Sequence, residues 1–139
     1  MMEFSRRETL GLALGAAALT VLPLRLHAST EDRIAEFTGG ADMADTGIEL
    51  TAPEIAENGN TVPIEVNAPG ATAIMVLATG NPTPGVATFN FGPMAASQSA
   101  ATRIRLAGTQ DVVAIAKLAD GSFAKASAAV KVTIGGCGG

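Results

Sequence analysis

Alternation of apolar and polar residues dominates the chain between residues 47 and 134. Residues 64–67 read Ile-Glu-Val-Asn, and residues 103–106 read Arg-Ile-Arg-Leu. This period of two places the apolar side chains on one face of a β-strand and the polar ones on the other. Residues 71–80 are almost continuously apolar, which is typical of a strand buried on both faces. We count about seven short strands, at the turn spacing of a β-sandwich.

Glycine-containing turns divide these strands. Asp120-Gly121 separates two apolar stretches, so we expect two strands joined there. Asn58-Gly59 predicts a hairpin in which both turn residues adopt positive φ. Pro63 cannot donate to a strand ladder, so the second strand of that hairpin needs an edge or a bulge. The sequence therefore predicts an all-β, immunoglobulin-like antiparallel β-sandwich with Greek-key topology.

A short helix is predicted ahead of the strands, within residues 29–40. Ser29 or Thr30 can cap its first turn, which is acidic, and two glycines end it. Ile34 and Phe37 share one face because they are three residues apart. A helix of this length is not stable alone, so we expect it to dock on another part of the protein.

The N-terminus is typical of an export signal. Arg6 and Arg7 precede an uncharged stretch, residues 10–22, which is shorter than the about 20 residues that a membrane-spanning helix needs. Paired arginines favour the twin-arginine route to the periplasm, with cleavage after Ala28. The alternative is a signal anchor that is never cut. We expect three parts: a signal (1–28), a β-sandwich domain (29–134) and a tail (135–139).

Composition and charge exclude several functions. Residues 29–139 contain six Lys or Arg and eleven Asp or Glu, so the net charge of this part is −5. It has no basic run, and we expect no binding to nucleic acid or to membranes. The one histidine, His27, lies in the predicted signal. Without another histidine, neither a Ser-His-Asp nor a Cys-His centre can form, and we expect no catalytic residue, no metal site and no cofactor.

The last residues place a single thiol between glycines. Cys137 is the only cysteine, and Gly135, Gly136, Gly138 and Gly139 flank it. Such a tail is a flexible tether that could extend about 17 Å and carry a sulfur atom into a pocket of another protein. An ordinary thiol has a pKa of about 8.5, and no basic residue is adjacent, so activation must come from the partner. This favours a carrier. An interchain disulfide through Cys137 is the alternative.

These features resemble a known family. The twin-arginine signal, the stretch Ile-Ala-Glu-Asn-Gly-Asn-Thr-Val-Pro-Ile (residues 55–64) and the terminal Gly-Gly-Cys-Gly-Gly together are similar to SoxY. SoxY proteins are the sulfur-carrier subunits of the periplasmic thiosulfate-oxidising (Sox) system. The resemblance covers essentially the whole chain, and the position of the glycine-flanked cysteine at the very end is its most specific part.

The resemblance implies a role for the tail and a set of partners. Cys137 would be the attachment point for thiosulfate-derived sulfur, on an arm formed by the four flanking glycines. SoxZ would be the partner in a stable heterodimer. The cytochrome SoxXA would join thiosulfate to the thiol, and the hydrolase SoxB would release sulfate. Where SoxCD is present, it would oxidise the remaining sulfur. The protein itself would then be a carrier and not an enzyme.

Overall fold

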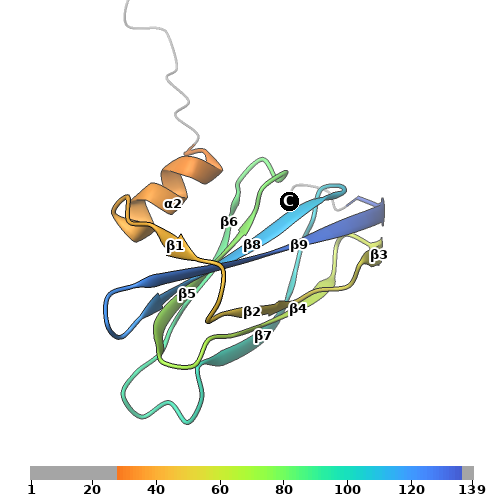
Figure 1. Cartoon of the computed structure of the whole chain (residues 1–139). Helices are drawn as coiled ribbons and strands as arrows, with labels where there is room; N and C mark the ends of the chain where they lie inside the picture. The colour runs from red at the N-terminus through yellow and green to blue at the C-terminus, as the bar shows by residue number, and fades with distance from the viewer. Residues whose placement is uncertain (1–27, 136–139) are drawn as a thin grey trace, which may run out of the picture.

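The computed structural model describes residues 28–135, which form one helix and nine strands (Figure 1). The elements in chain order are α2 (Thr30–Thr38), β1 (Met43–Ala44), β2 (Glu49–Thr51), β3 (Ile55–Asn58), β4 (Val62–Asn67), β5 (Ala71–Ala78), β6 (Gly85–Asn90), β7 (Ser99–Ile104), β8 (Gln110–Leu118) and β9 (Phe123–Ile134). The predicted all-β, immunoglobulin-like fold with one short N-terminal helix is confirmed.

The strands form two sheets. The larger has the order β1-β9-β8-β5-β6, with β3 paired to the far end of β9, and the smaller has the order β2-β4-β7. Most neighbours are antiparallel, but β1 and β3 both run parallel to β9. Strand β9 is the longest element and is shared by three partners: β8, β1 and β3.

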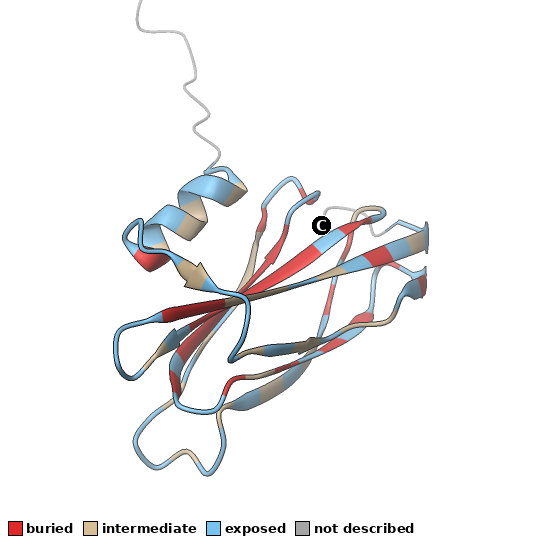
Figure 2. Cartoon of the chain, viewed as in Figure 1, coloured by how far each residue is buried: buried red, intermediate tan, exposed pale blue. Residues whose placement is uncertain are grey.

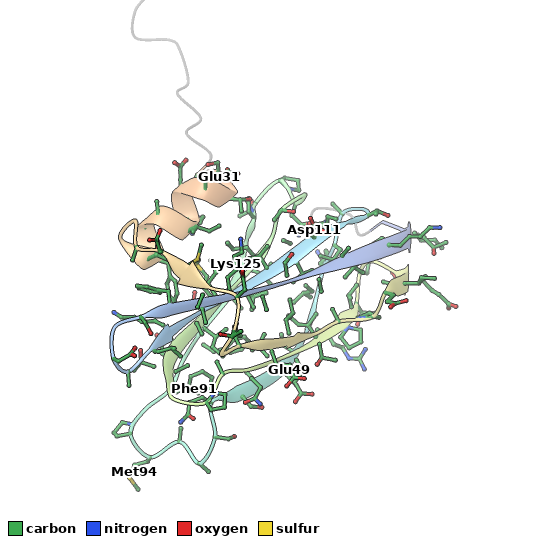
Figure 3. The ribbon with its side chains drawn as sticks, in the orientation of Figure 1. Glu31, Glu49, Phe91, Met94, Asp111 and Lys125 are labelled. Atoms are coloured by element: carbon green, nitrogen blue, oxygen red, sulfur yellow. The ribbon has the colours of Figure 1, made fainter. Side chains whose placement is uncertain are left out.

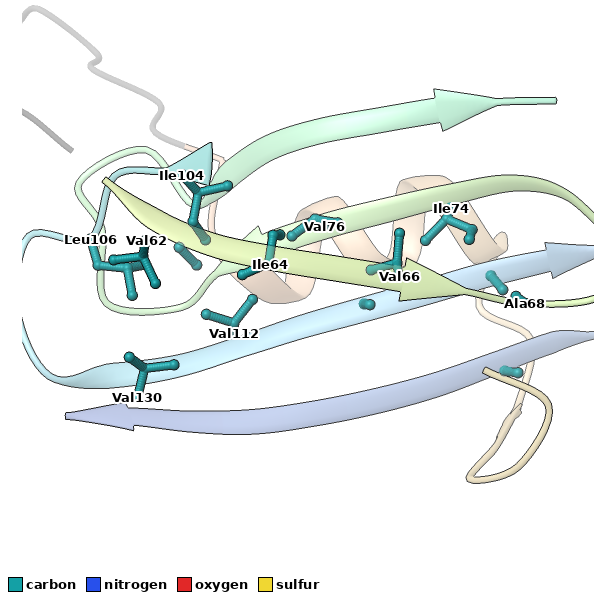
Figure 4. Close-up of a cluster of buried hydrophobic side chains, with 14 of the residues drawn as sticks. Val62, Ile64, Val66, Ala68, Ile74, Val76, Ile104, Leu106, Val112 and Val130 are labelled. Carbon is teal, nitrogen blue, oxygen red and sulfur yellow. The ribbon is translucent and has the colours of Figure 1, made fainter. Parts of the chain in front are cut away.

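The main core lies between the two sheets (Figures 2 and 4). In strand β4 the side chains of Val62, Ile64 and Val66 are buried in the core, as the alternation of apolar and polar residues predicts. The residues between them are exposed. They pack with side chains of the larger sheet that include Ile74, Val76, Val112 and Val130. Removal of this apolar area from water is the main stabilisation of the two-sheet arrangement.

Helix α2 covers part of the other face of the larger sheet. Ser29 caps it with a capping box: its hydroxyl accepts from the backbone N–H of Asp32 at 3.2 Å, and its own N–H donates to the Asp32 carboxylate at 3.1 Å. Ile34 and Phe37 pack on a second buried cluster of the sheet. The rings of Phe37 and Phe123 meet edge to face, with their centroids 5.9 Å apart. The predicted docking of the helix is therefore confirmed.

The prediction of a hairpin at Asn58-Gly59 is wrong. Strand β3 pairs with β9, and β4 pairs with β2 and β7. Neither Asn58 nor Gly59 has a positive φ. Instead the Asn58 side chain accepts from the N–H of Asn60 at 3.0 Å, which turns the chain between sheets. The Asn-Gly sequence correctly predicted a turn, but contacts with distant strands determine how the strands on either side of it pair. The strand pair joined at Asp120-Gly121, β8 and β9, is confirmed.

Candidate functional site: the root of the C-terminal tail

The last residues of β9 leave the body of the sheet as a two-stranded ribbon. Pairing with β8 ends at Val130, and β3 then becomes the partner, with Lys131 opposite Ile55 and Ile134 opposite Asn58. The ribbon lies at the end of the molecule farthest from the β8–β9 turn (Figure 1). We call residues 131–135, β3 and the residues bonded to them the root, because the tail with Cys137 starts there.

Gly59 connects the end of β9 to the loop after β7. Its backbone N–H donates to the carbonyl of Ile134 at 2.7 Å, and its own carbonyl accepts from the N–H of Leu106 at 2.7 Å. Gly59 is buried, whereas its neighbours Asn58 and Asn60 are exposed. These two short bonds fix the last strand residue relative to residues 105–108.

Two buried amide side chains hold residues 105–108 in place. The Asn81 side chain donates to the carbonyl of Arg105 at 2.8 Å, and its oxygen accepts from the N–H of Ala107 at 2.9 Å. That oxygen also accepts from the amide of Gln110 at 2.8 Å. Gln110 donates further to the carbonyl of Gly108 at 3.0 Å. Because a buried polar group is costly without partners, this saturated network defines one conformation of the loop.

Thr109 attaches the ribbon to the body, and Glu54, the residue before β3, adds a bond between the two strands of the ribbon. The hydroxyl of Thr109 accepts from the N–H of Val132 at 3.0 Å. The carbonyl of Glu54 accepts from the N–H of Lys131 at 2.9 Å. The ribbon is therefore bonded to neighbouring segments at Thr109 and at Gly59, in addition to the pairing between its two strands.

Gly135 packs closely on the loop that the buried amides fix. A Cβ atom at position 135 would overlap the carbonyl oxygen of Ala107. Its φ is not positive. The absence of a side chain at this position therefore has a steric reason, in addition to the conformational freedom that the sequence suggests.

The other predicted site residues lie outside the described part of the chain. These are Cys137, Gly136, Gly138 and Gly139 of the tail, and Arg6 and Arg7 of the signal. Apart from Gly135, the residues that build the root were not predicted as functional. Asn81 belongs to a proline-rich turn, Gly59 was noted only as a turn residue, and Gln110 follows no motif, so their roles depend on contacts between distant segments.

Other candidate chemistry is sparse in residues 28–135. No group of three or more His, Cys, Asp or Glu there could hold a metal ion. No helix in this range is long and apolar enough to cross a membrane. Arg103 is exposed and lines a shallow open hollow of about 570 Å³ together with Pro53 and Pro63. Met75 is buried in the core under the helix, and Met43 is partly buried beside it.

One carboxylate has a perturbed pKa. Asp120, in the β8–β9 turn, accepts from the hydroxyl of Ser122 at 2.6 Å and from its backbone N–H at 2.9 Å. These hydrogen bonds stabilise the charged form and lower the pKa of Asp120 below 3.8. The turn lies at the end of the sheet opposite the root, so this group stabilises the fold and does not belong to the site (Figure 1).

The fold and the root together define an immunoglobulin-like β-protein that starts its C-terminal tail from a hydrogen-bonded ribbon. The sequence matches the family described as "Sulfur oxidation protein SoxY" over residues 34–137. The chain belongs to the SoxY family. The matched range ends at Cys137, so the cysteine lies within the part that resembles the family.

Solved structures agree with this assignment. The sulfur carrier protein SoxY from Chlorobium limicola f thiosulfatophilum matches with 37% identity and a TM-score of 0.65, over 75% of this chain and 96% of that one. A superoxide reductase (neelaredoxin) from Ignicoccus hospitalis matches with 17% identity and a TM-score of 0.55, over 63% of this chain and 80% of that one. At that identity the second match indicates a shared fold alone. Comparison with curated protein sequences finds no match.

Proposed function

We propose that this protein is a covalent carrier of sulfur intermediates in thiosulfate oxidation, and that the thiol of Cys137 holds the cargo. The observation that carries the proposal is the position of the chain's only cysteine, two residues beyond Gly135, where the hydrogen-bonded ribbon ends. Membership of the SoxY family and similarity to a sulfur carrier protein support it. The described residues contribute a fixed starting point, and the glycines around Cys137 contribute a tether.

The attachment is an oxidation that another protein must perform. The Cys137 thiol and thiosulfate become linked through a new S–S bond, with loss of the thiol proton and two electrons to the cytochrome partner. Water then cleaves the bond between the sulfane sulfur and the sulfonate on the hydrolase. This step releases sulfate and a proton and leaves a persulfide on Cys137. The carrier keeps each intermediate bound, and so presents it in a defined position to the next enzyme.

Family membership and the N-terminal sequence support a set of proposed partners and a proposed compartment. We propose SoxZ as the heterodimer partner, and SoxXA, SoxB and, where present, SoxCD as transient ones. The N-terminal Arg6 and Arg7 motif supports export to the periplasm by the twin-arginine route. In this role the chain has no turnover of its own and needs no metal or cofactor.

Intact-mass spectrometry tests the proposal. Wild-type protein in complex with SoxZ, incubated with thiosulfate and an oxidised SoxXA-type cytochrome, should gain the mass of one thiosulfate-derived group. Peptide mapping should place the added group on Cys137. Cys137→Ser protein should gain nothing. An unmodified Cys137, or a mass gain that persists in the serine variant, would contradict the carrier role. A dimer that forms only through a Cys137–Cys137 disulfide would favour the structural alternative.

A further inference from the structure

Two of the three large apolar side chains that are highly exposed in residues 28–135 lie on the β3–β9 ribbon. Ile134 is 65% exposed and Ile55 is 61% exposed, while the third, Met94, is 94% exposed on the loop between β6 and β7 (Figure 3). Ile134 is the last residue of β9 and is followed directly by Gly135. An exposed isoleucine at this position is notable because Val130 and Val132, the apolar residues before it in β9, are buried or partly buried.

The two isoleucines lie on opposite faces of the ribbon. Ile134 is two residues after Val132 and four after the buried Val130, so these three side chains lie on the same face of β9. Ile55 is in register with Lys131, whose side chain lies on the other face. Side chains alternate between faces along a strand. Ile134 therefore continues the row that faces the core, but lies past the end of the core. It shares the end of the ribbon with Gly135, which packs on Ala107.

The length of the tail limits how far Ile134 can be from any enzyme that receives the thiol. Cys137 is three residues after Ile134, so their Cα atoms are at most about 10 Å apart. An active site that receives the Cys137 sulfur below its surface must therefore bring its rim to the root. Hydrogen bonds to Gly59 and Thr109 hold the ribbon, so the root cannot follow the tail inward.

From this geometry we infer that Ile134 is a docking contact that packs against an apolar rim at the entrance of the enzyme that joins thiosulfate to Cys137. The inference rests on the proposed function, because it takes Cys137 as the group that enters the enzyme. An isolated apolar contact beside a short tether adds affinity by removing its exposed area from water. It also orients the tail toward the entrance before the thiol reacts.

Steady-state kinetics of thiosulfate attachment test the inference. Ile134→Thr keeps a β-branched side chain in the strand but removes most of the apolar surface. We expect kcat/KM for attachment to fall about tenfold, the size typical of an interface side chain that contributes to affinity. The change should lie in KM, with kcat retained, because the contact is made equally before and during the chemical step. Ile134→Val should stay close to wild type.

Two matched controls use the other exposed apolar residues. Ile55→Thr makes the same change on the opposite face of the ribbon, and Met94→Gln removes a more exposed side chain far from the root. Both should keep kcat/KM within about twofold of wild type. Thermal unfolding, and the rate at which Cys137 reacts with a small disulfide reagent such as DTNB, should be equal in all variants.

The outcomes separate this inference from the proposed function. If wild-type protein is loaded on Cys137 and Ile134→Thr has a wild-type KM, the docking contact is wrong and the carrier role stands. An equal loss in either control would also overturn the inference, because the effect would not be specific to Ile134. If wild-type protein gains no mass on Cys137, the proposed function itself fails.

Discussion

The backbone N–H of Gly59 donates to the carbonyl oxygen of Ile134 at 2.7 Å. This bond joins the start of the connection between β3 and β4 to the last residue of β9. The same glycine accepts from Leu106 at 2.7 Å, so three segments far apart in sequence meet where the tail begins. These bonds fix the end of β9, from which the proposed tether would extend.

Close packing at Gly135 predicts the effect of a single methyl group. Gly135→Ala would push a Cβ into the carbonyl oxygen of Ala107, so the loop or the end of β9 must shift. We expect a loss of about 1–3 kcal/mol in the free energy of unfolding, as is typical of overpacking. Chemical denaturation measures it, and amide chemical shifts should change at Leu106 and Ala107.

Gly108→Ala is the matched control for this steric effect. Gly108 belongs to the same loop and has no positive φ, and a Cβ added to it would meet no heavy atom within 4 Å. Its substitution should leave stability within about 0.5 kcal/mol of wild type. Equal behaviour of the two variants would show that Gly135 is not held against Ala107.

The buried side-chain amide of Asn81 should contribute more to the free energy of unfolding than the exposed amide of Asn60. Asn81→Ala removes the acceptor of Ala107 and Gln110 and the donor to Arg105. We expect about 2–4 kcal/mol of destabilisation, because buried groups are left without partners. Urea denaturation should show a lower midpoint, with little change for the exposed Asn60→Ala. A loss below about 0.5 kcal/mol would mean that water replaces the amide without cost.

Strands were easier to predict than their partners. Alternation at Val62, Ile64 and Val66 and the apolar run of β5 depend on which side chains face a core, and this is written locally in the sequence. The choice of β9 as the partner of β3 depends on packing between distant segments, so the Asn58-Gly59 hairpin was wrong.

Cys137 as the attachment point stays a prediction from the sequence, and, apart from Gly135, the residues that build the root could not be predicted from it. A lone cysteine between glycines is visible in any reading of the sequence. Asn81 and Gln110 look like ordinary turn and strand residues until folding brings them within 2.8 Å of each other. Hydrogen bonds between residues far apart in sequence leave no period or spacing to detect.

The β8–β9 turn predicts a dependence of stability on acid. The folded-state pKa of Asp120 is lowered below 3.8 by its bonds to Ser122, so the charged form stabilises the fold. This contribution is present above the unfolded-state pKa of about 3.8 and is lost as the pH falls through the lower, folded-state value. The melting temperature of wild type should exceed that of Asp120→Asn near neutral pH, and the difference should shrink only below pH 3.8. A difference that shrinks already between about pH 7 and pH 5 would contradict the assignment.

The length of the tail should control delivery in a carrier and not in a disulfide-linked module. Deletion of Gly136 moves Cys137 about 3.4 Å closer to the root, where Gly59 and Ala107 hold the chain. Because the sulfur must reach a reacting centre inside the enzyme, we expect the rate of thiosulfate attachment to fall at least about tenfold, the order of loss expected for a misplaced reacting group. The rate at which the thiol reacts with a small disulfide reagent should stay the same, which separates the distance that the thiol can reach from its intrinsic reactivity.

The matched variant removes Gly139 instead. This deletion shortens the chain by one residue but leaves Cys137 at the same number of residues from the root, and thiosulfate attachment should be retained. Intact-mass time courses on the two deletions and wild type give all the rates. If thiosulfate attachment were equally fast in both deletions, Cys137 would not need to enter a pocket. That result would favour the alternative, in which Cys137 forms an interchain disulfide.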